Sequence, residues 1–198
     1  MLKYEGIIFR MGDCILKAIF IGLLWLIGSL PMITIGAATT AAYFTSIKLA
    51  ENEDVKVLPN FWRSYKQNLI QSIILLLPFL VIGIGMICFY LNTNYFTQLN
   101  PTVSVGYLMF TIVWIILTIS VFPILSKFNM NSIQIFKSSI LLVYKQKLII
   151  TKVIFLFSLL SFIVILMPQY IIFMIGGYFM IAGRWYHQAF CEIVKAYQ

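Results

Sequence analysis

Charged side chains are scarce in this sequence, and three long stretches contain none. Only 10% of its 198 residues are charged and 62% are hydrophobic, whereas soluble domains have roughly 25% charged and 45–50% apolar residues. Residues 18–47, 67–126 and 153–183 contain no Asp, Glu, Lys, Arg or His. Each window exceeds the ~20 apolar residues with which a helix crosses the ~30 Å hydrocarbon core of a bilayer. This excludes a soluble domain and predicts an all-α integral membrane protein.

Acidic residues are also few, six against 14 basic ones, so the net charge is +8. A basic excess in a soluble protein can indicate binding to nucleic acid. Here the basic residues gather at the ends of apolar segments, where the positive-inside rule places them on the cytoplasmic side. We therefore expect no nucleic-acid partner, and we expect anionic lipids of the cytoplasmic face as partners instead.

The residues that carry chemistry are scarce as well. Cys14, Cys88 and Cys191 lie far apart, so the sequence indicates no disulfide framework and no CxxC metal spacing, and we expect the cysteines to be apolar filler. His187 shares a helix face with Cys191, but a metal would need further ligands. HExxH, GxSxG and phosphate-binding glycine motifs are missing. The sequence therefore predicts no enzyme, no catalytic residues, no cofactor and no metal.

Apolar segments define a membrane topology. They cover residues 15–33, 36–49, 69–91, 104–125, 148–166 and 169–186. Six passes place every basic residue on one face together with both termini, and the positive-inside rule makes that face cytoplasmic. The second segment is only ~21 Å long as a helix, so a short span and a re-entrant helix both stay open. We predict a polytopic transmembrane helical bundle with about five to six membrane-embedded helices in a bacterial cell membrane.

The whole chain, residues 1–198, is predicted to be one integral membrane domain. The motif "YKQNLI" from Tyr65 recurs as "YKQKLI" from Tyr144, and each copy opens a unit of surface helix, span, link and span. Parallel repeats of this kind occur in transporters. The predicted parts are an N-terminal hairpin 15–49, hairpin units 58–125 and 132–186, and a short cytoplasmic tail 187–198.

Two cytoplasmic segments have the pattern of amphipathic surface helices. In residues 58–73 and 132–150, apolar residues recur at helical spacing and basic residues lie opposite them. Docking of a cytoplasmic partner and anchoring to lipid are both open for these helices. The candidate interface residues are Phe61, Trp62, Arg63, Tyr65, Lys66, Lys137, Tyr144 and Lys145.

The stretch "SLPMITIGAATTAAYF" from Ser29 is rich in small and hydroxyl residues. We expect Pro31 to end the first helix, and Thr34 to cap the next one by accepting a bond from a free backbone N–H. Small residues let helices approach closely in lipid, so a tight buried hairpin is expected, while the lining of a pore uses the same residue types. The candidate packing residues are Pro31, Thr34, Gly36, Ala37, Thr40 and Ala41.

Arg184 marks the cytoplasmic end of the last apolar segment. We expect it to pair with Asp13 or with lipid phosphates. The spans themselves contain no ionisable residue away from their ends. Ion-coupled transporters usually hold such a residue at depth, so a proton-coupled pump is disfavoured.

The hairpin and the aromatic-basic segment after it resemble the YesL-like family of bacterial integral membrane proteins, domain of unknown function 624. The resemblance covers roughly the first 75 residues. It rests on Leu30, Pro31, Thr34, Gly36, Ala37, Thr40 and Ala41, followed by Phe61, Tyr65, Lys66 and Asn68. It adds Asn68 to the candidate interface and implies a membrane setting, with no assigned activity. Such proteins are often encoded among genes of carbohydrate uptake and utilisation.

Two functions are therefore expected. The first is a non-enzymatic accessory or interaction component associated with carbohydrate uptake or utilisation, whose partner is a carbohydrate ABC transporter subunit or a second copy of the chain. The alternative is a small uncoupled sugar transporter or channel that works as an oligomer, with a polar cavity lined by Thr39, Thr40, Ser120 or Ser161.

Overall fold

The computed structural model describes residues 2–52, 54–91, 101–128 and 130–195, and their side chains except at 2–11, 101–103 and 194–195. These residues form helices and no strand, which confirms the predicted all-α fold. In chain order the elements are α1 (Leu2–Ser29), the 3₁₀ turn η1 (Met32–Thr34), α2 (Ile35–Glu51), α3 (Val57–Leu91), α4 (Pro101–Lys127), α5 (Ser132–Lys145), α6 (Lys147–Leu166), the 3₁₀ turn η2 (Pro168–Tyr170) and α7 (Ile171–Lys195).

Four helices in the described ranges are long and apolar enough to cross a membrane. The qualifying stretches are Gly12–Ser29, Val57–Leu91, Ser104–Lys127 and Lys147–Leu166. At most a third of each window is buried inside the protein, so most of their apolar side chains face outward. The other two predicted segments became α2, which has 17 residues, and α7, whose apolar part ends at Arg184. The chain is a membrane protein, as its composition predicts.

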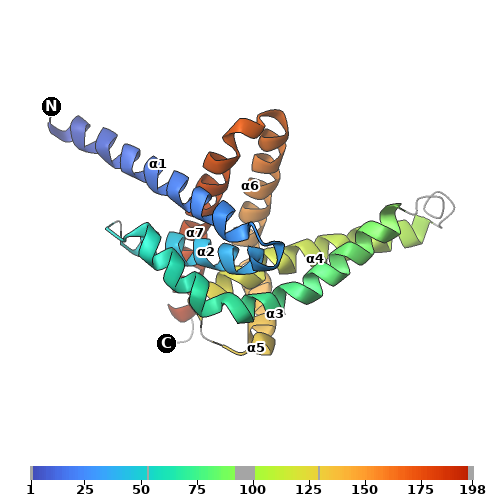
Figure 1. Cartoon of the computed structure of the whole chain (residues 1–198). Helices are drawn as coiled ribbons and strands as arrows, with labels where there is room; N and C mark the ends of the chain where they lie inside the picture. The colour runs from blue at the N-terminus through green and yellow to red at the C-terminus, as the bar shows by residue number, and fades with distance from the viewer. Residues whose placement is uncertain (1, 53, 92–100, 129, 196–198) are drawn as a thin grey trace.

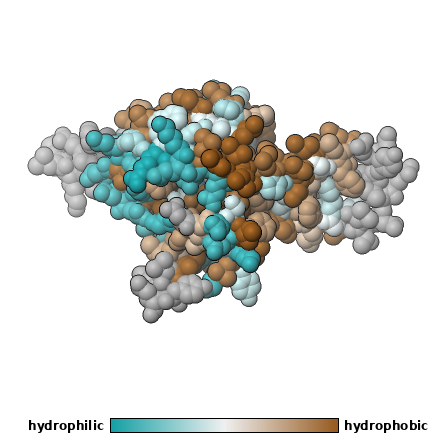
Figure 2. Space-filling view, turned by 60° about the horizontal axis from the view of Figure 1, so that its bottom comes forward, coloured by the Kyte–Doolittle hydropathy of each residue, from teal (hydrophilic) through white to brown (hydrophobic). Residues whose placement is uncertain are grey.

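Helix α2 lies at the centre of the molecule and contacts α1, α3, α4 and α7. Figure 1 shows the other helices crossing around it, with the α3–α4 pair extending to one side and the α6–α7 pair to another. Figure 2 shows hydrophobic surface on the α3–α4 arm and hydrophilic surface gathered on the opposite part of the molecule. A short helix surrounded by others needs small side chains, because backbones must approach closely where apolar burial gives no drive.

Glycines set the two closest crossings of α7. A Cβ atom at Gly176 would lie 1.8 Å from the backbone oxygen of Ala18, and one at Gly22 would lie 2.2 Å from a backbone oxygen of α7. Farther along, where α7 crosses α2, a Cβ at Gly183 would lie 2.5 Å from the Cβ of Ser46. Real Cβ contacts are essentially never this short, so α1, α2 and α7 can pack in this way only with glycine at these places.

The two predicted hairpin units do not repeat each other in detail. The predicted surface segment and span of the first unit form one continuous helix, α3, whereas the same parts of the second unit are divided at Gln146 into α5 and α6. Gln146 has φ −115° and ψ 47°, and its carbonyl accepts from the N–H groups of Ile149 and Ile150 at the start of α6. Residues 187–195 of the predicted cytoplasmic tail continue α7 without a break. Residues 196–198 of that tail lie outside the described residues.

Candidate functional sites

The hairpin residues occupy the middle of the bundle. Ala37, Thr40 and Ala41 have no exposed surface, and a Cβ at Gly36 would lie 3.0 Å from the ring of Phe122. The hydroxyl of Thr40 donates to the backbone oxygen of Gly36 at 2.8 Å, so it bonds within its own helix and does not line a path.

The start of the hairpin differs from the expectation. Pro31 is exposed and follows the end of α1, as a helix-ending proline should. Thr34 does occupy the N-cap of α2, but its side chain makes no capping bond. Its hydroxyl instead donates back to the carbonyl oxygens of Gly28 at 2.8 Å and Pro31 at 2.7 Å. The predicted role as an acceptor was wrong, because the hydroxyl bonds to free carbonyls of the turn that precedes α2.

The aromatic-basic segment at the start of α3 divides into an inner and an outer face. Phe61 is fully buried, Tyr65 donates through its hydroxyl to the carbonyl oxygen of Gly28 at 3.2 Å, and Asn68 donates to the carbonyl oxygen of Ser64 at 3.0 Å. These three candidates of the predicted interface therefore hold α3 against α1 or bond within α3.

The outer face of the same segment consists of Trp62, Arg63 and Lys66, which are exposed. The ring of Trp62 is 36% exposed and lies edge-on to Tyr65, with ring centroids 5.3 Å apart. The exposed indole of Trp62 therefore lies beside two cations and packs against the ring of Tyr65. We call these three residues the α3 outer face.

Helix α5 presents its predicted apolar stripe outward. Its buried residues are Ile135, Ser139 and Leu142. The predicted stripe of Ile133, Phe136, Ile140 and Tyr144 is exposed, with Tyr144 at 73%. Lys137 and Lys145 lie on the same helix outside its buried face. Because the helix uses a different face to contact the protein, its stripe is left for lipid or a partner.

Of the two partners expected for Arg184, Asp13 does not pair with it in the described structure, and pairing with lipid phosphates stays a prediction. Asp13 instead pairs with Lys17, one turn along α1, at 2.5 Å, and a guanidinium nitrogen of Arg184 lies 4.0 Å from the sulfur of Cys14. Of the cysteines that we expect to be apolar filler, Cys14 is half-buried, and Cys88 and Cys191 are exposed.

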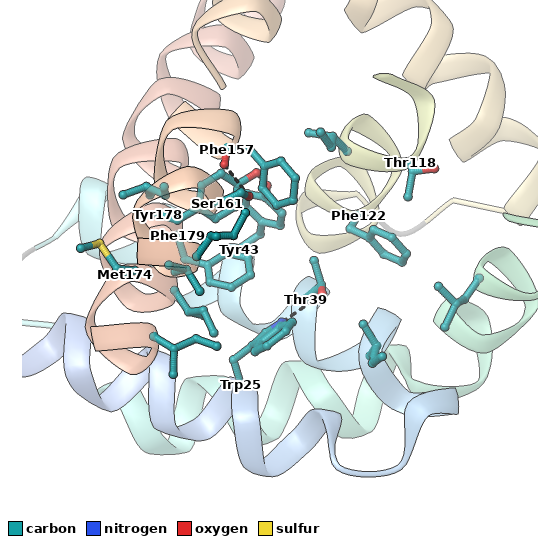
Figure 3. Close-up of a pocket in the computed structure, with 18 residues that line it drawn as sticks. Trp25, Thr39, Tyr43, Thr118, Phe122, Phe157, Ser161, Met174, Tyr178 and Phe179 are labelled. Carbon is teal, nitrogen blue, oxygen red and sulfur yellow. Dashed lines mark hydrogen bonds between the residues drawn. The ribbon is translucent and has the colours of Figure 1, made fainter. Parts of the chain in front are cut away.

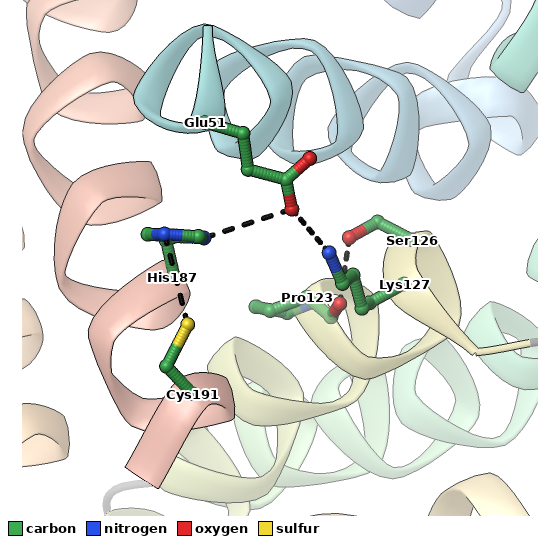
Figure 4. A network of polar contacts seen from close by, with 6 residues as sticks. All are labelled: Glu51, Pro123, Ser126, Lys127, His187 and Cys191. Atoms are coloured by element: carbon green, nitrogen blue, oxygen red, sulfur yellow. Dashed lines mark hydrogen bonds and ion pairs between the residues drawn. The ribbon is translucent and has the colours of Figure 1, made fainter. Parts of the chain in front are cut away.

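A polar cluster joins the ends of three helices (Figure 4). Glu51, at the end of α2, forms an ion pair with Lys127, at the end of α4, through its Oε1 atom. The Nδ1 atom of His187 on α7 lies 3.6 Å from the same oxygen, and its Nε2 atom lies 3.7 Å from the sulfur of Cys191. We did not predict Glu51 and Lys127 as site residues. Their position at the ends of two apolar segments on the predicted cytoplasmic side was the signal that could have indicated them.

Tyr186 carries a buried hydroxyl that has no hydrogen-bond partner in the described part of the chain. An unsatisfied buried hydroxyl costs about 1–3 kcal/mol. We expect Tyr186→Phe to stabilise the protein by about 1 kcal/mol, measured by unfolding in mixed micelles. Tyr178→Phe is the matched control: it removes the 2.8 Å bond between the hydroxyls of Tyr178 and Tyr43 and should destabilise. A loss of stability for Tyr186→Phe would contradict this interpretation.

A pocket of about 500 Å³ lies between α1, α2, α3, α4, α6 and α7. Figure 3 shows side chains of α6 and α7 facing it on one side, α4 on the other, and α1 and α2 below. Its wall is almost wholly aliphatic and aromatic. The lining residues are Trp25, Ile35, Thr39, Tyr43, Leu76, Thr118, Ile119, Phe122, Phe157, Leu160, Ser161, Val164, Ile165, Ile171, Met174, Ile175, Tyr178 and Phe179.

The pocket differs from the polar cavity that the channel alternative predicts. Thr39 and Ser161 do line it, but the hydroxyl of Thr40 bonds to the carbonyl of Gly36 and that of Ser120 to the carbonyl of Ile116.

Comparison with known proteins bears on the first part of this architecture. Residues 19–92 match the family model described as "Protein of unknown function, DUF624". The matched segment is similar to DUF624 over 74 of the 198 residues. The match confirms the family that the hairpin and the aromatic-basic segment resemble. No curated protein and no solved structure matches the chain.

The DUF624 segment contains the last 11 residues of α1 and all of α2 and α3. It therefore includes the turn at Pro31 and the α3 outer face. The glycines of α7, the partners of Glu51 and the parts of the pocket wall that come from α4, α6 and α7 lie beyond it. The DUF624 segment thus supplies the core against which the rest of the chain packs.

Proposed function

We propose that this protein is a non-enzymatic accessory component of a bacterial cell membrane that contacts a carbohydrate-uptake system through its cytoplasmic face. The proposed topology is multi-pass with both termini in the cytoplasm. The proposed partner is the membrane subunit of a carbohydrate ABC transporter, and anionic lipids neutralise the remaining cations of that face. Self-association is the other outcome to be tested.

The α3 outer face is the observation that carries this proposal. Aromatic and arginine side chains are the residues most enriched among the energetic anchors of protein interfaces. Trp62 and Arg63 stand exposed and adjacent, while the neighbouring Phe61 is fully buried and fastens their helix to the bundle. A rigid base lowers the entropy lost on binding, so this face is suited to an acidic protein surface.

The polar cluster supports the proposed topology. It brings together the ends of α2, α4 and α7, and Gln146, at the joint of α5 and α6, donates to Glu192 at 2.8 Å. All these positions belong to the side that the basic residues indicate as cytoplasmic.

The apolar pocket makes the accessory role a better proposal than the sugar channel. A sugar that leaves water needs hydrogen-bond partners along its path. In the pocket, Thr118 donates to the carbonyl of Trp114 and Ser161 to that of Phe157, both at 2.8 Å. These hydroxyls are already engaged in their own helices, and the surrounding wall offers a sugar little else.

The proposal is tested by purifying the tagged chain from native membranes in a mild detergent and quantifying co-purified subunits by mass spectrometry. We expect a carbohydrate-transport subunit to be enriched. The double variant Arg63→Glu/Lys66→Glu should lower its capture at least about tenfold, because reversed charges across an interface cost several kcal/mol.

The matched control is Lys152→Glu, which changes an exposed cation at the start of α6, away from the α3 outer face. Its capture should equal that of the wild type. Enrichment of no carbohydrate-transport subunit, or equal capture by the double variant, would overturn the proposal. Recovery of a second, differently tagged copy alone would replace it with self-association.

A further inference from the structure

We propose that the pocket between α1, α2, α3, α4, α6 and α7 binds one long, unbranched or isoprenoid hydrocarbon chain of a membrane lipid. This inference does not depend on the proposed accessory role. It follows from the polarity of the wall, from the medium at the mouth of the pocket, and from its size.

The wall holds almost no polar group that a ligand could use. The indole N–H of Trp25 donates to the hydroxyl of Thr39 at 3.1 Å, and the hydroxyls of Thr118 and Ser161 donate to backbone carbonyls of their own helices. An occupant therefore has to be apolar along nearly its whole length, because a polar group without a partner there would lose its hydrogen bonds.

One donor remains in the pocket wall. The hydroxyls of Tyr43 and Tyr178 share one hydrogen bond of 2.8 Å. Two phenols contain two O–H donors, and one bond uses only one of them. The second can meet at most a single acceptor, which suits a chain with an apolar body and excludes a sugar or a charged headgroup at this depth.

The mouth of the pocket opens onto hydrocarbon. Ile165 at the end of α6 lines the pocket and is also 78% exposed. On the same helix, Phe162 and Leu159 continue the exposed apolar surface, and α6 is one of the helices suited to span a bilayer. The medium that meets this rim is therefore lipid, and a chain can enter from the side without crossing water.

The size fits a single chain. Pockets that hold small ligands have volumes of about 300–1,000 Å³, and this one has about 500 Å³. A second copy of the protein would have to insert a whole helix, whose diameter is about 10–12 Å with its side chains. A flexible hydrocarbon chain can adapt to the space between Phe122 on α4 and Phe157 on α6.

The experiment uses Trp25 as a reporter of the occupant. In the full-length protein, Trp62, Trp114 and Trp185 are replaced by Phe, and the protein is purified in a sterol-based detergent that carries no alkyl chain. Dibromostearic acid is then titrated while the fluorescence of Trp25 is followed. We expect saturable quenching that ends at one chain per protein. A second variant that keeps only Trp185, which does not line the pocket, should show no saturable quenching.

A variant whose new side chain fills the pocket tests whether the chain binds there. Ser161→Phe places a ring inside the pocket and should weaken the saturable quenching at least about tenfold, since the added volume competes with the chain. Ser158→Phe is the matched control: the residue is exposed on the same helix and does not line the pocket, so binding should stay as in the parent. Bound stearate should likewise raise the melting temperature of the parent and of Ser158→Phe, but not that of Ser161→Phe.

The source of the chain is decided by competition. Displacement of the brominated acid by unbrominated stearate at lower concentration than by farnesol identifies an acyl chain, and the reverse order identifies an isoprenoid chain; either result supports the proposal. Quenching of Trp25 that does not saturate, or that is equal in Ser161→Phe and Ser158→Phe, would overturn it.

Discussion

Gly176→Ala is expected to separate α7 from α1 and to give the largest loss of stability of any single methyl group added to this protein. The new Cβ would lie 1.8 Å from the backbone oxygen of Ala18 and 3.2 Å from the backbone nitrogen of Gly22. Backbone atoms cannot rotate away as a side chain can, so the two helices must move apart along their whole contact. We expect a cost of at least about 3 kcal/mol, the upper end of overpacking, measured by unfolding in mixed micelles.

Gly177→Ala is the control, since it adds the same methyl group one residue away. A Cβ at Gly177 would meet no atom within 4 Å. Alanine is favoured over glycine in a helix by up to about 1 kcal/mol, so Gly177→Ala should be neutral or slightly stabilising. Equal stability of the two variants would show that α1 and α7 do not cross at Gly176.

Phe61→Ala is expected to loosen the start of α3 from the bundle. Phe61 has no exposed surface, and it stacks on Tyr65 with ring centroids 6.2 Å apart. Truncation of a buried Phe to Ala costs about 3–5 kcal/mol, from lost burial and the cavity left behind. The loss of stability should appear as a lower midpoint of unfolding. The fraction of molecules in which the Tyr65 hydroxyl bonds to the carbonyl of Gly28 should also fall.

Trp62→Ala is the matched change on the other side of the same helix turn. Because Trp62 is 36% exposed, its removal should cost at most about 1 kcal/mol of stability. The same variant should lower the capture of the proposed partner, whereas the stability of the free protein stays nearly unchanged. If Trp62→Ala destabilised the protein as much as Phe61→Ala, the division of this segment into inner and outer faces would be wrong.

The central hairpin shows how far local sequence can go. Pro31 predicts the end of α1, and the small residues from Gly36 to Ala42 predict a helix that others approach closely; α2 is indeed buried among four helices. The prediction that the Thr34 hydroxyl accepts a capping bond was wrong, since it donates to carbonyl oxygens instead. Its hydroxyl can accept as well as donate, and which it does depends on whether the end of α1 or the start of α2 lies nearer in space.

The amphipathic segments show where local pattern becomes insufficient. Helical spacing predicts Phe61, Trp62 and Tyr65 on one apolar face of α3, but Trp62 is exposed beside Arg63. The spacing also could not tell whether that face meets lipid, a partner or the protein itself. In α5 the corresponding stripe faces outward, and Ile135 and Leu142 make the contact with the bundle. In a membrane protein both lipid and protein interior are apolar, so hydrophobicity alone does not distinguish the two.

Composition and the distribution of charge were enough to determine that this chain is a helical membrane protein, because hydrocarbon excludes ionised groups from any segment that crosses it. Only the tertiary structure decided which glycines touch another backbone, that Glu51 meets Lys127, and that six helices leave an apolar pocket beside Trp25. Those features join residues from distant parts of the sequence, and the angle at which two helices cross is determined by the shapes of both surfaces together. The sequence of one helix therefore does not determine the crossing angle by itself.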